Sequence, residues 1–190
     1  MGLQDLLTED VLRFAVVQEL VTAGVSPAHI VTEWRRPGVP DAVDLVLSEP
    51  TWTAIEFKFP REPRETNAAW TQHLGEVLKD FYRLTTMPPE FDDRWCVQLL
   101  SNRMRRYLDG VAERHQVTLG VAPGEATVLD PDVVRGLPGT ALKALSRWTL
   151  DSAPTVHARC SRLIESETIY VWSSTEWLTT SPAHRATVRA

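Results

Sequence analysis

The chain is poor in the residues and segments that mark secreted, zinc-binding or membrane proteins. It has only two cysteines in 190 residues, Cys96 and Cys160, and neither belongs to a CxxC or Cys/His cluster. This usage indicates a reducing compartment and disfavours a disulfide scaffold or a zinc site. No apolar run approaches the roughly 18 residues of a membrane span, and the first residues lack the basic and apolar regions of an export signal. We therefore expect a cytoplasmic protein with no membrane partner.

An excess of positive charge is also lacking. Lys and Arg number 20 against 25 Asp and Glu, which gives a formal net charge of −5. Proteins that coat nucleic acid are usually basic, so any nucleic-acid contact should be confined to a small face or shared with a partner. The hydrophobic share of 43% is sufficient for a core, and a charged share of 24% excludes a disordered composition.

Hydrophobic periodicity predicts an α/β fold in which helices flank a mixed β-sheet. Thr8 is placed to cap the first helix, and Glu9 lies in its first turn, where the helix dipole favours acids. At helical spacing, Glu9 and Glu19 share a face with the apolar residues and point toward the core. The elements form an αβββαβ core followed by a further helix. They are helix 8–23, strands 29–34, 42–48 and 52–59, helix 70–85, strand 94–100 and helix 102–115.

The second part of the chain has weaker patterns and no chemical motif. We expect one domain over residues 1–180, with a core over about 8–115 and an extension over about 116–180. The extension enlarges the sheet, covers it or contacts a partner, and residues 181–190 are predicted to form a disordered tail. Candidate elements of the extension are strands 117–122 and 126–129, a helix over 139–149 and a late hairpin of strands 156–160 and 168–173.

The second and third strands predict a β-hairpin whose register follows from burial. A short loop centred on Pro50 matches the apolar faces of the two strands, whereas a slip of one residue would mix apolar and polar faces. In this register Asp44 lies directly opposite Glu56, and Lys58 follows on the same face. The opposed apolar pairs are Leu45–Ile55, Val43–Phe57 and Leu47–Thr53.

Two carboxylates that face each other across neighbouring strands repel, so they need a neutralising partner. Opposed residues have Cβ atoms about 4.5–5.5 Å apart. Mg²⁺ or Mn²⁺ suits this position, because Mg²⁺ takes one or two carboxylates and keeps several waters. The Lys58 ammonium can hold an attacking water or stabilise charge on a phosphate, and a bound metal acidifies its water. Asp44, Glu56 and Lys58 therefore supply the parts for metal-assisted phosphodiester hydrolysis.

The same residues resemble a known nuclease superfamily. Asp44, followed after eleven residues by Glu56-Phe57-Lys58, is similar to the motif of PD-(D/E)xK, or restriction-endonuclease-like, proteins. The resemblance covers residues 8–115, a little over half of the chain. It implies a restriction-endonuclease-like fold and a Mg²⁺- or Mn²⁺-dependent endonuclease that acts on nucleic acid, DNA in particular. It also implies that Asp44, Glu56 and Lys58 are catalytic and that the two acids bind the metal.

Further site residues are implied by the resemblance. Family members add a glutamate from the first helix as a metal ligand, and Glu9 is favoured over Glu19 by its place in the first turn. Some relatives carry a glutamine on the helix after the motif, and Gln72 is the candidate here. Asp41 completes a literal Pro-Asp dipeptide. The register favours Asp44 instead, because Asp41 falls at the turn end of its strand, on the apolar face.

Purely structural explanations stay open for each of these residues. Asp44 and Glu56 can form the solvated face of an edge hairpin, with Lys58 as their neutralising partner. Glu9 can be a first-turn acid that serves only the helix dipole. A structural role of this kind is compatible with an inactive enzyme.

Candidate phosphate contacts are arginines near the ends of the motif strands and at the start of a later helix. A solvated surface explains the same residues. Gln72 can likewise belong to a polar helix face with Asp80 and Arg83. The candidate arginines are Arg35, Arg36, Arg61, Arg64, Arg103, Arg105 and Arg106.

Three functions follow from these patterns. The first is a metal-dependent nuclease in a restriction, defence or repair setting. The second is a catalytically inactive nuclease-like binding module, or a subunit of a larger nucleic-acid-processing complex. The acidic net charge and the lack of a helix-turn-helix or zinc-finger pattern favour it. The third is a structural homodimer in which the hairpin acids are incidental.

Overall fold

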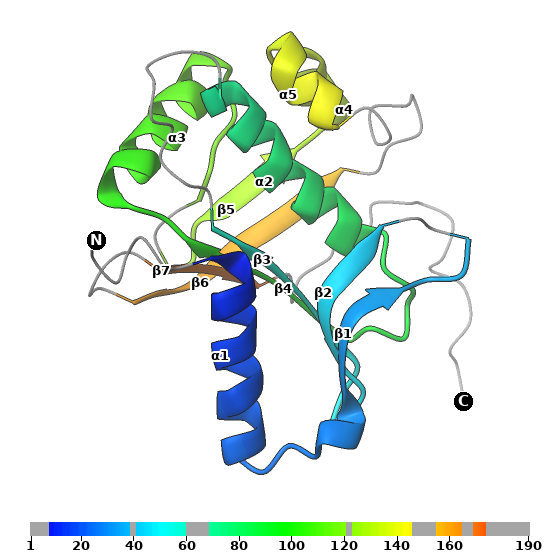
Figure 1. Ribbon diagram of the computed structural model, residues 1–190. Helices are drawn as coiled ribbons and strands as arrows, with labels where there is room; N and C mark the ends of the chain where they lie inside the picture. The colour runs from blue at the N-terminus through cyan, green and yellow to red at the C-terminus, as the bar shows by residue number, and fades with distance from the viewer. Residues whose placement is uncertain are drawn as a thin grey trace.

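A computed structural model describes residues 8–38, 41–59, 69–120, 123–145, 155–164 and 169–173, and the structural statements below concern these residues. Figure 1 shows the helices and strands along the chain. They are α1 (Glu9–Thr22), the 3-10 helix η2 (Pro27–His29), β1 (Ile30–Arg35), β2 (Ala42–Leu47), β3 (Thr53–Lys58), α2 (Ala69–Thr85), β4 (Asp93–Leu99), α3 (Asn102–Arg114), β5 (Ala126–Leu129), α4 (Pro131–Arg135), α5 (Gly139–Ala144), β6 (Val156–Ile164) and β7 (Ile169–Ser173).

The strands form one mixed sheet of seven strands in the order β1-β2-β3-β4-β7-β6-β5. β3 and β4 pair in parallel, joined by α2 as the crossover, and the other neighbours pair antiparallel. This confirms the predicted α/β class with a mixed sheet flanked by helices. The order α1-β1-β2-β3-α2-β4 is also the order predicted for the core.

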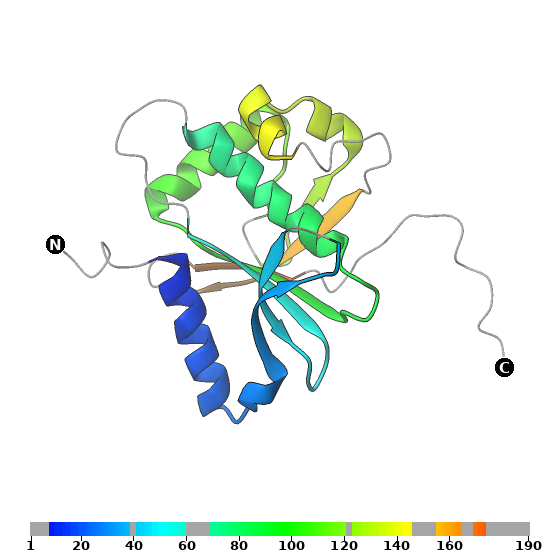
Figure 2. The same ribbon diagram turned by 45° about the vertical axis from the view of Figure 1, so that its right-hand side comes forward.

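The helices lie on the sheet in two groups. α2, α3, α4 and α5 gather on one side of the sheet, whereas α1 stands apart from them with its N-terminal end near β3 (Figures 1 and 2). The main core lies under α2, where Val46 of β2 and Ala54 of β3 belong to the same buried cluster as Leu78 and Phe81 of the helix. The face of β3 that carries Ala54 also carries Glu56, so α2 covers the acid of the motif.

Helix α1 begins as predicted but packs differently. The Thr8 side chain accepts a hydrogen bond from the Val11 amide at 3.2 Å, as an N-cap residue does. No residue of α1 is buried, and Phe14 is 68% exposed. The prediction that Glu19 points toward the core is wrong, because its side chain is exposed. The reason is the placement of the helix: the ion pairs that join it to the sheet come from Glu9 and Arg13 in its first two turns, and Glu19 lies further along the helix.

The extension enlarges the sheet, which was one of its three predicted roles. β5, β6 and β7 are present, and β7 pairs with β4, the strand next to the motif strand β3. Residues 117–120 form no strand, and α4 was not predicted. Residues 121–122, the end of the predicted helix 139–149 and the predicted tail 181–190 lie outside the described residues.

Both cysteines, Cys96 on β4 and Cys160 on β6, are buried. Burial raises the pKa of the Cys96 thiol well above its usual value, so its reactive thiolate is disfavoured. Among the helices that the structure describes, none combines the length and the apolar character that a membrane span requires.

Candidate functional site

The β2–β3 hairpin has the predicted register up to the site. Leu45 pairs with Ile55, and Leu47 pairs with Thr53. The regular ladder ends at Leu45, so the predicted pairs Asp44–Glu56 and Val43–Phe57 are not ladder pairs. The physical reason is the Asp44 side chain: its Oδ2 accepts a hydrogen bond from the Phe57 amide at 2.7 Å. The carboxylate thus takes a backbone donor of β3 and lies over the neighbouring strand.

Asp44 is largely covered and faces a cation from α1. Its side chain is 13% exposed, and its Oδ1 lies 3.8 Å from Arg13 Nη1. Arg13 also binds Glu33 of β1. Glu33 has a φ of 53°, a left-handed conformation that costs a non-glycine residue about 1–3 kcal/mol. In the β1–β2 ladder, the residues before and after Glu33 pair with the residues after and before Asp44, so these two acids lie at facing positions on adjacent strands. The positive charge of Arg13 therefore neutralises both.

Glu56 is the most deeply placed acid of the motif. Its side chain has no exposed surface, which excludes the solvated-hairpin explanation. Its Oε1 accepts a hydrogen bond from Arg83 Nη1 of α2 at 2.8 Å. Its Oε2 has no hydrogen-bond partner among the described residues. Burial raises the pKa of Glu56 well above its usual range, and Asp80 raises it further while Arg83 opposes the shift.

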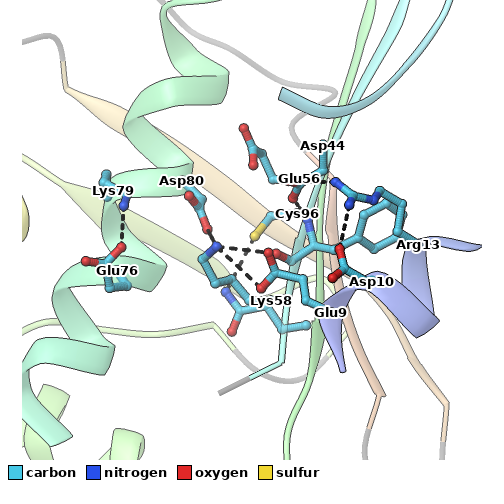
Figure 3. Close-up of polar contacts among 12 residues, drawn as sticks. Glu9, Asp10, Arg13, Asp44, Glu56, Lys58, Glu76, Lys79, Asp80 and Cys96 are labelled. Atoms are coloured by element: carbon cyan, nitrogen blue, oxygen red, sulfur yellow. Dashed lines mark hydrogen bonds and ion pairs between the residues drawn. The ribbon is translucent and has the colours of Figure 1, made fainter. Parts of the chain in front are cut away.

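Lys58 lies between two acids that come from different helices (Figure 3). Its Nζ is 3.3 Å from Asp80 Oδ2 of α2 and 3.7 Å from Glu9 Oε2 of α1. Burial disfavours the ammonium, but the carboxylates of Asp80 and Glu9 raise the pKa of Lys58 above its usual value. Lys58 is therefore a fixed positive charge that joins α1, β3 and α2.

Asp80 has no exposed surface and lies beside both cations of the site. Its Oδ1 is 3.6 Å from Arg83 Nη1, in addition to its contact with Lys58. Burial raises the pKa of Asp80 to about 6, against the lowering effect of the Lys58 and Arg83 charges. Burial likewise raises the pKa of Glu9.

The structure brings together four of the predicted residues: Asp44, Glu56, Lys58 and Glu9. Glu19 is exposed on the far part of α1, and Gln72 is exposed two turns before Asp80 on α2. Neither belongs to the group of charges around Lys58. Asp41 lies just before β2, and its charge helps to raise the pKa of Arg83.

The arginines predicted to contact phosphate differ in their exposure and in their contacts. Arg36 donates to the Thr86 carbonyl at 3.1 Å, and Arg105 lies 3.7 Å from the Asp109 carboxylate. Both therefore have structural partners. Arg35, Arg103 and Arg106 have exposed side chains. Arg61 and Arg64 lie outside the part of the chain that the structure describes.

Sequence reasoning treated Asp80 and Arg83 as members of a polar helix face and missed their contacts with the motif. A signal was available in the hairpin. Both faces of β3 carry apolar residues, so the face with Glu56 and Lys58 had to be covered, and the helix that follows was the nearest cover. A polar residue buried on that helix must then meet Glu56 or Lys58, since buried charges are paired.

The donors at the site suit a hard divalent cation in their chemistry. They are carboxylate oxygens, the ligands that Mg²⁺ prefers, and the buried Oε2 of Glu56 is left without a partner. An unpaired buried oxygen costs about 1–3 kcal/mol, which a bound cation would offset. Within the described residues, no three His, Cys, Asp or Glu side chains are arranged as a ready metal-binding group. Arg13, Lys58 and Arg83 lie among the acids instead.

No protein-family model matches the sequence, and no match is found among the curated proteins or the solved structures. Any assignment of function therefore depends on the residues of the site.

Proposed function

We propose that this protein is a metal-dependent nuclease that hydrolyses phosphodiester bonds in nucleic acid, DNA in particular, and that it belongs to the PD-(D/E)xK superfamily. The observation that carries the proposal is the meeting of Asp44, Glu56 and Lys58 with Glu9 at one place. The hairpin of β2 and β3 contributes three of these residues, and α1, an earlier part of the chain, contributes the fourth. A buried acid with an unpartnered oxygen beside a fixed ammonium is costly for folding alone, and a catalytic role explains why it is present.

Each residue of the site has its own role in the proposed hydrolysis. Glu56 Oε2, Asp44 Oδ1 and Glu9 are the oxygens that would hold Mg²⁺ or Mn²⁺, which when bound acidifies water and polarises the phosphoryl group. Lys58 keeps its proton, so it acts as a positive charge that orients the nucleophile or stabilises charge on the phosphate. Asp44 is itself fixed by the Phe57 amide. Asp80 and Glu9 hold the ammonium in place.

The direct test is cleavage of plasmid, linear double-stranded and single-stranded DNA, and of RNA, with Mg²⁺ or Mn²⁺ and with EDTA as the block. Asp44→Asn, Glu56→Gln and Lys58→Met are the informative variants, and Asn retains an acceptor for the Phe57 amide. We expect each to lower the cleavage rate by about 10²–10³-fold, the usual cost of removing one charge-stabilising group.

Matched controls are present on α2. Glu76 and Lys79 form an ion pair on the same helix as Asp80, and no hydrogen bond or ion pair drawn in Figure 3 joins either of them to Lys58 or Glu56. Glu76→Gln and Lys79→Met change the same residue types by the same substitutions, and both should cut like the wild type. Purified Lys58→Met protein that cleaves at the wild-type rate would refute the nuclease proposal.

A nuclease-like binding module is the second candidate, and one observation favours it. Lys58 and Arg83 already neutralise Asp80 and Glu56, so the acids can be held without a metal. Isothermal titration with Mn²⁺ separates the two functions. An active site binds Mn²⁺ and loses that binding on Glu56→Gln, whereas a repurposed scaffold shows no heat of binding.

A further inference from the structure

Arg83 joins three segments around Glu56. From α2, its Nη1 donates to Glu56 Oε1 at 2.8 Å and to the Ala42 carbonyl oxygen at 3.3 Å. The same nitrogen lies 3.6 Å from Asp80 Oδ1. The guanidinium therefore ties the first residue of β2 and the acid of β3 to the helix that covers them.

The contact with Glu56 uses one oxygen of the carboxylate and leaves the other open. Oε1 is bound to Arg83, whereas Oε2 is buried and has no hydrogen-bond partner among the described residues. A carboxylate held at one oxygen has a fixed orientation. Its second oxygen then keeps its lone pairs for a further ligand.

The geometry of the Arg83–Glu56 contact indicates whether Arg83 orients Glu56 for a metal ion or takes the place of that ion. An arginine that took the place of a metal ion would be expected to bind both carboxylate oxygens with its planar fork, the usual geometry of a strong Arg–carboxylate pair. Here a single nitrogen, Nη1, donates to one oxygen of Glu56 and also to the backbone carbonyl of Ala42. Arg83 is thus anchored to the scaffold of the hairpin and does not enclose the acid.

We propose that Arg83 is a positioning residue of the metal site, which fixes Glu56 through Oε1 so that Oε2 is presented to a divalent cation. The inference rests on the proposed function and assigns a role to a residue outside the motif. Groups that orient a metal ligand in this way typically change metal affinity by about 10–100-fold when they are removed.

Mn²⁺ binding by isothermal titration calorimetry tests this directly, independent of cleavage. Arg83→Met and Arg83→Gln remove the charge and should weaken Mn²⁺ binding by about 10–100-fold. Arg83→Lys keeps a charged donor and should restore part of the affinity. Arg94→Met is the matched control, because Arg94 also donates to backbone carbonyls, of Thr85, Met87 and Pro88, away from Glu56. It should bind Mn²⁺ like the wild type.

The outcomes separate this inference from the proposed function. Circular dichroism first establishes which variants are folded, and Arg83→Gln or Arg83→Lys provides the comparison if Arg83→Met is not. Folded Arg83 variants that bind Mn²⁺ as tightly as the wild type, or more tightly, overturn the positioning role and leave the nuclease proposal intact. A wild-type protein that binds no Mn²⁺ overturns the proposed function, and this inference with it.

Discussion

Asp80 is a carboxylic acid with no exposed surface, held between the charges of Lys58 and Arg83. Burial raises its pKa from 3.8 to about 6 in the folded protein. Between these values the folded state binds the proton more tightly than the unfolded state, so the free energy of unfolding falls as the pH rises. The contribution of Asp80 to that fall is up to about 3 kcal/mol, and it is complete above pH 6.

Asp80→Asn removes this titration. Urea denaturation of metal-free protein at several pH values should give a flatter stability curve for Asp80→Asn than for the wild type between about pH 4 and 6. Glu56, Lys58 and Arg83 surround the position in both proteins. Asp132→Asn alters an exposed acid of α4 and should leave the shape of the curve unchanged. Parallel curves for the wild type and Asp80→Asn would show that Asp80 does not titrate in this range.

At the scale of residues, the sequence predicted the acids and the ammonium of the motif but not their partners. Asp44, Glu56 and Lys58 follow from alternation on two strands, which is a local property. Arg83 and Asp80 come from a helix whose position relative to the hairpin is set by tertiary packing. A local sequence pattern cannot predict that position. The left-handed conformation of Glu33 also has no local signal, because glutamate rarely adopts it.

Helix α2 carries the two residues that hold the motif, so its position on the sheet sets the site. It is fixed on its outer side by a close approach to α5 at Gly75. A Cβ added there would lie 2.7 Å from the Ala141 carbonyl oxygen and 2.9 Å from Ala144 Cβ. Only a residue without a side chain allows this contact, since the nearest atoms include backbone that cannot rotate away.

Gly75→Ala therefore tests how firmly α2 is held. Overpacking of this kind costs about 1–3 kcal/mol, against a gain of roughly 1 kcal/mol in helix propensity. We expect a net loss of up to about 2 kcal/mol in the free energy of unfolding, measured by urea denaturation. Gly110→Ala in α3 is the control, because a Cβ there meets nothing within 4 Å, and it should stabilise the protein. Equal stabilisation by both substitutions would contradict the close contact.

At the scale of elements, prediction was accurate where periodicity is strong. The hairpin strands, α2, β4 and α3 were predicted to within one or two residues at each end. The same reasoning placed a strand over residues 117–122 that residues 117–120 do not form, and it missed α4. Short segments in the extension carry too few residues to show a period, so tertiary contacts decide their structure. The predicted burial of α1 was also too high, because an amphipathic pattern does not predict how closely a helix packs against the sheet.

For the whole molecule, the group of charges around Lys58 is a point where α1, the hairpin and α2 meet. The carboxylates of Glu9, Asp44, Glu56 and Asp80 outnumber the three nearby cations Arg13, Lys58 and Arg83. A divalent ion at this point would bind the folded protein only, because the acids come from segments that are separated in the unfolded chain. Metal binding should therefore stabilise the entire fold and not the hairpin alone.

Mn²⁺ at about one hundred times its dissociation constant stabilises a folded protein by about 2.7 kcal/mol. For a chain of this length, each kcal/mol raises the melting temperature by about 2–4 °C. We therefore expect Mn²⁺ to raise Tm by about 5–10 °C in calorimetry, and EDTA to reverse the shift. Glu56→Gln should abolish the shift, whereas Glu19→Gln, which changes an exposed acid of α1, should retain it. A shift that persists in Glu56→Gln would place the ion elsewhere, because a neutral amide at position 56 no longer supplies the charge that holds it.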